Sequence, residues 1–360
     1  MRIVCVVGTR PNIVKMAPVI AALRQRFPDW RLATVHTGQH YDRLMSDVFL
    51  EEFDMPEPDH VLGVGSGTHA EQIARVLERF QPVLAEEEPD LVLVPGDVNS
   101  TLGAALCADK MGAAVGHVES GLRSFDRSMP EETNRIATDH LSALCFLHSE
   151  EAIENLRAEG VGEERMKFVG NTMIDSLVAL EGLIRERGAA ASLGLKPGSY
   201  ILVTLHRPAL VDGPLLADAM QALSTVGSEL PVMFPVHPRT RKNLGGSDYP
   251  GVTLTDPVGY LDFLSLESEA AAVLTDSGGI QEETTYLGIP CFTLRDNTER
   301  PVTVRAGTNT LLGLDPGRIT EIPDLLRDRS ASGDGAKNPQ SPELWDGRAA
   351  ERVAEVLADW

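Results

Sequence analysis

Short hydrophobic runs alternate along this chain with longer stretches in which hydrophobic residues recur every three or four positions. The runs at 2–7, 31–36, 90–94 and 113–118 predict buried strands, and the periodic stretch at 69–85 predicts an amphipathic helix. Strands that alternate with helices in this way form a parallel sheet with helices on both faces. The first half of the chain is therefore predicted to be an α/β unit.

The same alternation returns in the second half of the chain. The pattern pauses near 165–178 and then continues with hydrophobic runs at 200–204, 232–236 and 271–275. These runs predict a second set of buried parallel strands. We therefore expect two successive parallel-sheet units, joined near the pause.

Two segments are predicted to lie outside the sheets. Residues 328–346 are rich in Ser, Gly, Pro and Asn, which predicts a surface loop before a last helix at 347–358. The glycine-rich segment 63–67 lacks the G-x-G-x-x-G spacing of a dinucleotide-binding loop, so it is interpreted as a loop before a helix.

Charge and cysteine content narrow the class of protein. The net charge of -21 disfavours nucleic acid and anionic membranes as partners, although local arginines and helix N-termini still permit a small anionic ligand. None of the four cysteines lies in a C-x-x-C pair, which predicts free, buried thiols in a reducing compartment. With no secretion signal and no apolar run of membrane-spanning length, the expected location is the cytoplasm.

The segment from Thr275 to Glu283 carries the strongest local signal for a ligand. A hydrophobic strand runs into Ser277, Gly278 and Gly279, and a helical pattern follows. Glycines let a ligand approach the backbone, and the free N–H groups and dipole at a helix start favour phosphate. Glu283 is placed to accept hydrogen bonds from ribose hydroxyls. A strand-to-helix turn that binds nothing explains the pattern equally well, so both readings stay open.

Further titratable side chains follow predicted strands. Asp97 and Glu119 end two strands of one sheet, where an acid is costly unless it is paired or used. His206 ends a strand of the second half, which makes a functional and a structural role about equally plausible. Arg300 follows the strand at 291–294 and is a candidate diphosphate partner, although, taken alone, a solvated loop is the better explanation.

Two predicted helix starts add candidates. Arg10 lies in the loop after the first strand, with Lys15 one turn into the next helix, and Glu131 opens another helix, where a lone acid ordinarily offsets the dipole. The sequence contains no H-x-x-H or H-E-x-x-H pair, which disfavours a metal site. It also lacks the G-x-S-x-G and G-x-x-x-x-G-K-[ST] motifs of common hydrolases and NTPases.

Taken in order, these motifs resemble those of the non-hydrolysing UDP-N-acetylglucosamine 2-epimerases. The resemblance spans nearly the whole chain and rests on GTRP (8–11), KMAP (15–18), GQH (38–40), PGD (95–97), GHVESGLR (116–123), PEETNR (130–135), GNT (170–172), LHR (205–207), PVHP (235–238), TDSGGIQEE (275–283) and TERP (298–301). Each motif is weak alone, but the ordered set is highly specific.

The resemblance implies a glycosyltransferase-B-like α/β fold, in which two Rossmann-type domains with parallel sheets face a central cleft. It implies an N-terminal domain at 1–170, with the closing helix at 347–360 packed back on it, and a UDP-binding domain at 171–346. It also implies a homodimer that interconverts UDP-GlcNAc and UDP-ManNAc without a cofactor or a metal. The expected route eliminates UDP to give a 2-acetamidoglucal and then adds UDP back.

By the same resemblance, site residues are assigned by motif. The catalytic residues fall on Asp97, Glu119, Glu131 and His206. The residues that bind the UDP-sugar fall on Arg10, Lys15, Ser277, Gly278, Gly279, Glu283 and Arg300, and Phe263 is expected near the uracil.

The chain also departs from the family pattern. Asn12 stands where the family has Glu, a less polar run at 208–212 follows Arg207, and Asp42 differs from the expected residue. The preferred sugar and activation by a second UDP-GlcNAc therefore stay open. The alternatives are a hydrolysing epimerase that releases ManNAc and UDP, an epimerase of a related UDP-sugar, a glycosyltransferase of the same fold and an inactive nucleotide-sugar sensor.

Overall fold

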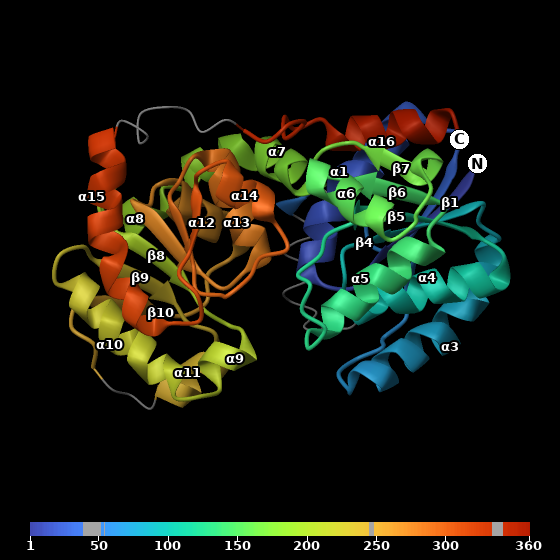
Figure 1. Ribbon diagram of the computed structural model, residues 1–360. Helices are drawn as coiled ribbons and strands as arrows, with labels where there is room; N and C mark the ends of the chain where they lie inside the picture. The colour runs from blue at the N-terminus through green and yellow to red at the C-terminus, as the bar shows by residue number, and fades with distance from the viewer. Residues whose placement is uncertain (39–51, 54, 245–247, 333–340) are drawn as a thin grey trace. The chain divides into compact units, whose positions relative to one another are not determined.

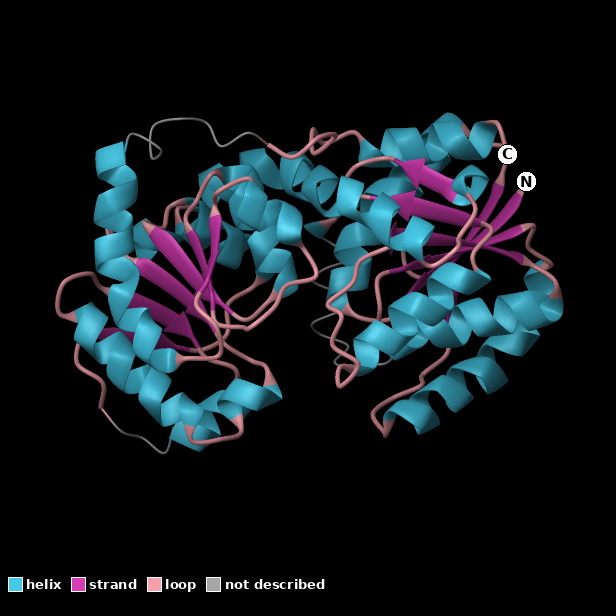
Figure 2. Cartoon of the chain, in the orientation of Figure 1, coloured by secondary structure: helices cyan, strands magenta, loops and turns pink. Residues whose placement is uncertain are grey.

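The chain forms two α/β units. The computed structural model describes residues 1–38, 52–53, 55–244, 248–332 and 341–360. Unit 1 comprises Met1–Ala179 and Glu343–Trp360, and unit 2 comprises Leu180–Pro342 (Figure 1). Each unit contains one sheet of parallel strands flanked by helices, as Figure 2 shows. The predicted architecture of two parallel-sheet units is confirmed.

Unit 1 is built on a seven-stranded sheet in the order β3-β2-β1-β4-β5-β6-β7. The strands are β1 (Arg2–Val7), β2 (Arg31–His36), β3 (His60–Val61), β4 (Leu91–Pro95), β5 (Ala114–Ser120), β6 (Leu144–Leu147) and β7 (Met166–Phe168). All strand pairs are parallel. β4 is buried along its whole length, as expected for a strand covered on both faces. The four strands predicted in this half are confirmed.

Helices cover the sheet of unit 1. They are α1 (Arg10–Arg26), α3 (His69–Glu87), α4 (Asn99–Met111), α5 (Pro130–Leu141), α6 (Glu150–Ala158), the first part of α7 (Thr172–Arg187) and α16 (Ala349–Ala358). Thr68 caps α3 in a capping box with Glu71, so the glycine-rich segment before it is a loop, as predicted. Asp175 of α7 accepts hydrogen bonds from the backbone N–H groups of Ala349 and Ala350, which fixes the start of α16.

Unit 2 is built on a six-stranded parallel sheet in the order β10-β9-β8-β11-β12-β13. The strands are β8 (Ile201–Thr204), β9 (Val232–Pro235), β10 (Val252–Thr255), β11 (Ala272–Thr275), β12 (Cys291–Thr293) and β13 (Asn309–Leu311). The helices are α8 (Ala189–Ser192), α9 (Pro208–Val211), α10 (Leu215–Gly227), α11 (Pro238–Leu244), α12 (Tyr260–Ser268), α13 (Gly278–Leu287), α14 (Pro301–Arg305) and α15 (Ile322–Ser332).

Strand order reverses once in each sheet, and this reversal identifies where a ligand is expected. In unit 1 the chain moves outward from β1 through β2 and β3, then returns to β4 on the other side of β1; in unit 2 the same happens around β8 and β11. Open α/β sheets bind ligands outside the carboxyl ends of the strands at such reversals. The loops after β1, β4 and β5, and those after β8 and β11, are therefore the ones that matter for function.

The surface loop predicted at 328–346 is partly wrong. Residues 328–332 belong to α15, where Arg329 donates hydrogen bonds to the Thr308 carbonyl and to Thr310 Oγ1. Near its other end, Trp345 is buried, and its Nε1 donates to the His148 carbonyl at 2.8 Å. Long-range contacts hold both ends of the segment, and composition does not reveal them.

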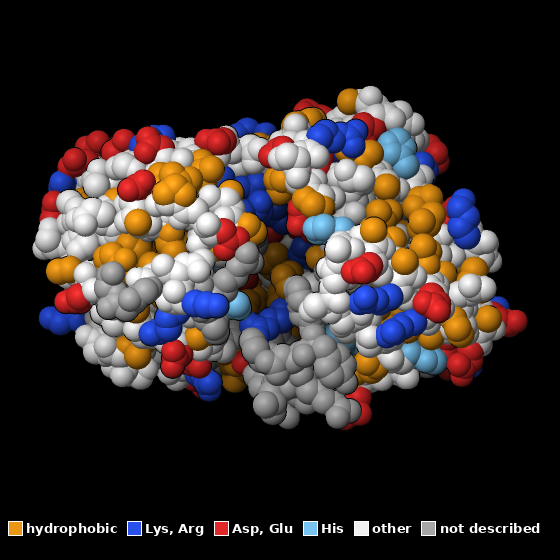
Figure 3. All heavy atoms as spheres, turned by 90° about the horizontal axis from the view of Figure 1, so that it is seen from below, with side chains coloured by type: hydrophobic (Ala, Val, Ile, Leu, Met, Phe, Trp, Pro, Cys, Tyr) orange, Lys and Arg blue, Asp and Glu red, His pale blue; other side chains and the backbone are white. Residues whose placement is uncertain are grey.

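The state of the cysteines and the distribution of charged side chains can be compared with what the composition predicts. All four cysteines are free and buried, as predicted, and burial raises the pKa of Cys5 and Cys291 to about 12, so these thiols are unreactive. Within the described ranges, no helix is both long and apolar enough to cross a membrane. On the face shown in Figure 3, acidic and basic side chains are interspersed.

Candidate functional site

Glu119 lies at a β-bulge near the end of β5. Its carboxylate forms a buried ion pair with Lys15 Nζ from α1. The Glu119 backbone is left-handed, with a φ of 69°, and the pairing of β5 with β6 shifts register between Val118 and Ser120. Such bulges re-aim a side chain at a sheet edge, and a non-glycine residue in this conformation is a strained one. The strained backbone at the bulge therefore sets the direction of the Glu119 carboxylate.

Gly96 makes room for that ion pair. A Cβ atom at this position would lie 3.1 Å from Lys15 Nζ and 3.2 Å from Glu119 Oε2, and the φ of 63° also favours glycine. The loop after β4 thus approaches the Lys15–Glu119 pair closely, so two predicted site residues from α1 and β5 meet beside the end of β4.

Asp139 of α5 holds the end of β5. It accepts hydrogen bonds from His117 Nδ1 at 2.6 Å and from the Gly121 N–H at 3.1 Å, and it pairs with Arg123 at 2.7 Å. Burial alone would raise the pKa of Asp139, but the charge and hydrogen bond of His117, together with Arg123, hold it at about 2. These contacts lie on either side of Glu119 in the chain and fix its backbone.

Asp97, directly after β4, is bound by one arginine. Its Oδ2 accepts from Arg135 Nε at 3.0 Å and from Nη2 at 2.7 Å, and its side chain is about a quarter exposed. Arg135 also reaches Glu132 Oε2 at 2.6 Å. The Asp97 carboxylate is thereby held in a defined orientation while one side remains open to solvent.

The remaining predicted residues of unit 1 lie at two helix starts. Glu131 is the second residue of α5 and is partly exposed, and none of the described residues forms a hydrogen bond or ion pair with its carboxylate. Arg10 is the first residue of α1. The departure at Asn12 has a structural explanation: its side chain accepts from the Gly8 N–H and donates to the Pro95 carbonyl, joining the loop after β1 to the end of β4. The predicted Gln39, His40 and Asp42 lie outside the described residues.

In unit 2, His206 is oriented by a buried carboxylate. Its Nδ1 lies 2.8 Å from Asp276 Oδ1, and the backbone N–H groups of His206 and Arg207 both donate to Asp276 Oδ2. Burial alone would raise the pKa of Asp276, but the hydrogen bond and charge of His206 and the two backbone donors hold it below its usual value. The His206 side chain is 55% exposed, which leaves its other ring nitrogen available to a ligand.

The start of α13 has an arginine packed against it. Ser277 precedes the helix, and its side chain makes no capping hydrogen bond there. A Cβ atom at Gly278 would lie 2.5 Å from Arg300 Nη1, so only glycine lets the guanidinium rest on this backbone. Arg300 Nε lies 3.1 Å from Glu282 Oε2. The helix dipole and the arginine together make this turn favourable for an anion.

Glu283 lies in the second turn of α13 and faces α12. Its Oε1 accepts a hydrogen bond of 2.8 Å from the Tyr260 hydroxyl. Burial raises its pKa to about 7, with a further rise from Glu282, although the Tyr260 hydrogen bond acts in the opposite direction. Phe263 lies one turn along α12 from Tyr260 and packs against the core of unit 2.

Sequence reasoning missed the residues that hold the predicted ones. Arg135 and Asp276 are such partners that lie within the PEETNR and TDSGGIQEE motifs without being assigned a role, and Asp139 is one that lies outside every motif. Glu267 is different, because it lies seven residues after Tyr260 on the same helix face, where the pattern calls for a hydrophobic residue. It is fully buried, and among the described residues neither carboxylate oxygen has a hydrogen-bond partner.

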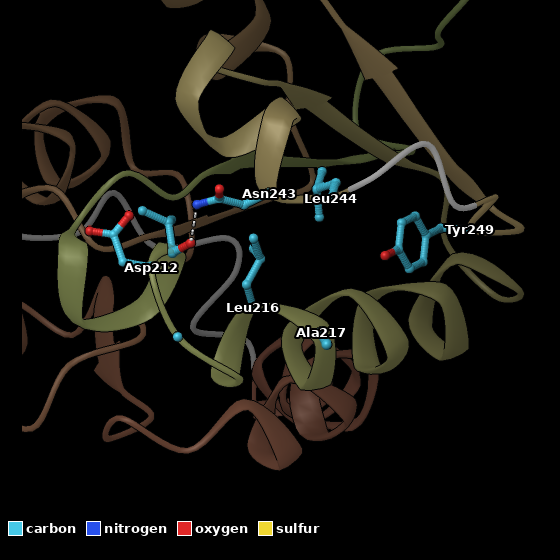
Figure 4. Close-up of a pocket in the computed structure, with 8 residues that line it drawn as sticks. Asp212, Leu216, Ala217, Asn243, Leu244 and Tyr249 are labelled. Atoms are coloured by element: carbon cyan, nitrogen blue, oxygen red, sulfur yellow. Dashed lines mark hydrogen bonds between the residues drawn. The ribbon is translucent and has the colours of Figure 1, made fainter.

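Unit 2 also contains a pocket of about 420 Å³ (Figure 4). It is lined by Val211, Asp212, Gly213, Leu216, Ala217, Asn243, Leu244 and Tyr249. Asn243 Nδ2 donates to the Val211 carbonyl at its edge. None of the predicted site residues lines this pocket, so it does not add to the candidate site.

The two parallel-sheet units, with acids at the strand ends of one and an anion-favouring helix start in the other, define an α/β enzyme class of the glycosyltransferase-B-like type that handles nucleotide sugars. A family model described as UDP-N-acetylglucosamine 2-epimerase matches residues 22–358. The chain belongs to this family.

Individual relatives agree with that assignment. The chain is 40% identical to UDP-N-acetylglucosamine 2-epimerase of Methanocaldococcus jannaschii, with 99% of each chain covered. It is 38% identical to UDP-2,3-diacetamido-2,3-dideoxy-D-glucuronate 2-epimerase of Pseudomonas aeruginosa, again with 99% of each covered. A crystal structure of the M. jannaschii enzyme in complex with UDP-GlcNAc and UDP superposes with a TM-score of 0.88 at 37% identity and covers 100% of both chains.

Proposed function

We propose that this protein reversibly epimerises UDP-GlcNAc to UDP-ManNAc at C2. The observation that carries the proposal is the family match over residues 22–358, together with two ion-paired acids at neighbouring strand ends of unit 1. Arg10 of unit 1 and the start of α13 in unit 2 supply groups for UDP, and the acids of unit 1 supply those for the sugar.

The reaction begins with departure of UDP. The C2 proton of a pyranose is not acidified by a carbonyl, so its removal alone is prohibitive. Breaking the bond from C1 to the UDP oxygen develops positive charge on the ring, and this makes the C2 proton easier to remove. Arg10, Arg300 and the turn of Ser277, Gly278 and Gly279 stabilise the charge that builds on the leaving UDP. The ribose hydroxyls donate to Glu283, and Phe263 supports the uracil.

The acids of unit 1 complete the elimination. One carboxylate takes the C2 proton, the C–H electron pair becomes the C1–C2 double bond, and UDP leaves with the former C1–O pair. Asp97, Glu119 and Glu131 supply the carboxylates, and Lys15 keeps Glu119 in place. Addition of UDP to C1 and of a proton to the opposite face of C2 gives the epimer. His206, oriented by Asp276, contacts the diphosphate of the substrate. No step requires a cofactor.

We also propose that the enzyme is a cytoplasmic homodimer. The four free, buried cysteines are consistent with a reducing compartment, and the dimer follows from the resemblance to the family. Light scattering of the purified protein tests the dimer, because a mass near twice 38.9 kDa is expected.

Proton NMR with UDP-GlcNAc and no acceptor tests the reaction. The expected result is a growing UDP-ManNAc anomeric signal at constant total UDP-sugar. Release of ManNAc and UDP would establish the hydrolysing reaction instead, and lack of turnover without an acceptor would support a glycosyltransferase. Because the P. aeruginosa relative is named for UDP-2,3-diacetamido-2,3-dideoxy-D-glucuronate, this UDP-sugar is the second substrate to compare. If kcat/KM is higher for that UDP-sugar than for UDP-GlcNAc, it is the preferred substrate and the proposal for UDP-GlcNAc is wrong.

A further inference from the structure

Phe125 is an aromatic residue of unit 1 whose side chain is exposed at the surface. It lies in the loop that joins β5 to α5 (Figure 1), and that loop connects Glu119 to Glu131. Its side chain is 78% exposed, the most of any large hydrophobic residue described. Its φ of 58° is left-handed, where a bulky side chain is an outlier. A residue that is both strained and exposed contributes nothing to packing.

The loop around Phe125 is nevertheless held firmly. Glu132 of α5 accepts hydrogen bonds from the Ser124 N–H at 2.9 Å, from Ser124 Oγ at 3.0 Å and from the Phe125 N–H at 2.9 Å. The same Glu132 pairs with Arg135, which binds Asp97. A continuous chain of contacts therefore fixes the backbone of Phe125 relative to the Asp97 carboxylate.

We propose that Phe125 contacts the pyranose of the bound nucleotide sugar and retains the intermediate until UDP adds back. The proposal rests on the epimerase function proposed above. The loop begins just after one acid assigned to the sugar and ends just before another, so its exposed ring belongs to the sugar end of the substrate. The C–H face of a pyranose is apolar, and an aromatic ring against it excludes water.

Retention matters because elimination is complete before re-addition begins. Once the proton has left C2 and the C1–O bond has broken, the neutral glucal and UDP are separate molecules. Either UDP adds back to C1, or both diffuse away as free products. Removing the ring raises the share of turnovers that end in free 2-acetamidoglucal and UDP, with no change in the bonds made or broken.

The test compares Phe125→Gly with Phe125→Tyr. Glycine adopts the left-handed conformation without steric cost, so Phe125→Gly is expected to melt no lower than wild type while it loses the ring. We expect its ratio of free glucal to UDP-ManNAc, measured by NMR, to rise about tenfold, as for loss of one apolar contact in a closed site. Phe125→Tyr keeps the ring and is expected to keep the wild-type ratio. UDP affinity is expected to stay unchanged in both.

The matched control is Leu193→Ala, which removes another exposed hydrophobic side chain, 43% exposed and in unit 2; its ratio is expected to equal that of wild type. An unchanged ratio in Phe125→Gly overturns the proposal, and so does a change in molecular mass without a change in ratio, because Phe125 then contacts a second copy of the chain. If wild type itself forms no UDP-ManNAc, the proposed function fails and this proposal with it. An active wild type with an unchanged ratio in Phe125→Gly refutes only the role of Phe125.

Discussion

The acids of the two units are balanced in opposite ways. In unit 1, each strand-end acid has its own cation, Lys15 for Glu119 and Arg135 for Asp97. In unit 2, Glu267 of α12 and Glu282 and Glu283 of α13 are all buried, and a neighbouring carboxylate raises the pKa of both Glu267 and Glu283 beyond the rise that burial causes.

This difference matches the two tasks. Ion pairs hold Asp97 and Glu119 of unit 1 in fixed orientations, which suits the proton transfer proposed for them. The acids of unit 2 form an environment in which Glu283 titrates near neutral pH and Glu267 stays protonated well above the usual range. Asp97 and Glu119 of unit 1 thus have fixed orientations, whereas Glu267 and Glu283 of unit 2 have raised pKa values in the part of the unit that we propose binds UDP.

The largest effect is expected from Glu119→Gln. Loss of one acid–base group lowers kcat by about 10²–10⁴-fold, while UDP affinity stays within a factor of about two because Glu119 is assigned to the sugar and not to the UDP. Steady-state kinetics and calorimetric titration with UDP measure the two quantities. Glu355→Gln, at an exposed glutamate of unit 1, is the control. Full activity of Glu119→Gln would remove Glu119 from the catalytic set.

The start of α13 is tested by Gly278→Ala. The added Cβ would lie 2.5 Å from Arg300 Nη1 and would displace the guanidinium. UDP affinity is expected to fall about tenfold, the loss of one charge-assisted contact to phosphate. Gly182→Ala, in α7, adds a methyl group where no heavy atom lies within 4 Å and should leave affinity unchanged. Equal affinities in both variants would show that Arg300 does not hold the diphosphate.

The Glu283 carboxyl predicts a pH dependence of UDP binding. The proposed contact uses the ionised form, which accepts hydrogen bonds from the ribose hydroxyls, and burial raises the pKa of Glu283 to about 7. UDP affinity is therefore full above that pH and falls below it, by at most about tenfold per pH unit. Because the phosphates of UDP also titrate, the informative quantity is the difference between wild type and Glu283→Gln. The same pH profile in both proteins would remove Glu283 from the binding site.

Glu267→Met has the smallest expected effect, and the effect is on stability. Burial, and the charge of Glu283, raise the pKa of Glu267 well above the ordinary value of a glutamate. A raised acid pKa makes wild type less stable as pH rises above the unfolded-state value, because the folded protein must keep the proton. Glu267→Met is therefore expected to be more stable than wild type at pH 8 by about 1–3 kcal/mol, which raises the melting temperature by a few degrees, and the difference is expected to shrink toward pH 4. A lower melting temperature at pH 8 would show that Glu267 has a stabilising partner.

Much of this arrangement follows from the sequence, and the limits have physical reasons. Hydrophobic runs such as 2–7 and 90–94 predict the strands, because a strand buried on both faces admits few polar residues. The strand ends then identify Asp97, Glu119 and His206. The pairing of these acids with their cations escapes prediction because the partners are distant in sequence; Lys15 and Glu119, both named as candidates, are 104 positions apart.

Local backbone geometry is the other limit. The bulge at Glu119 and the left-handed Phe125 arise from tertiary contacts, those of Asp139 and Glu132 respectively. The helical residues 328–332 are held by Arg329 in the same way. Spacing and composition carry no trace of such contacts, so the sequence locates the site without revealing how its side chains are aimed.

The central claim is that unit 1 removes and returns the C2 proton of a UDP-bound sugar, and isotope exchange tests it most directly. UDP-GlcNAc is incubated with the enzyme in deuterated water, and both UDP-sugars are recovered and examined by NMR. The account predicts deuterium at C2 of UDP-ManNAc and, at equilibrium, also of UDP-GlcNAc. Interconversion of the two sugars with protium retained at C2 would contradict the elimination mechanism and the role assigned to the acids of unit 1.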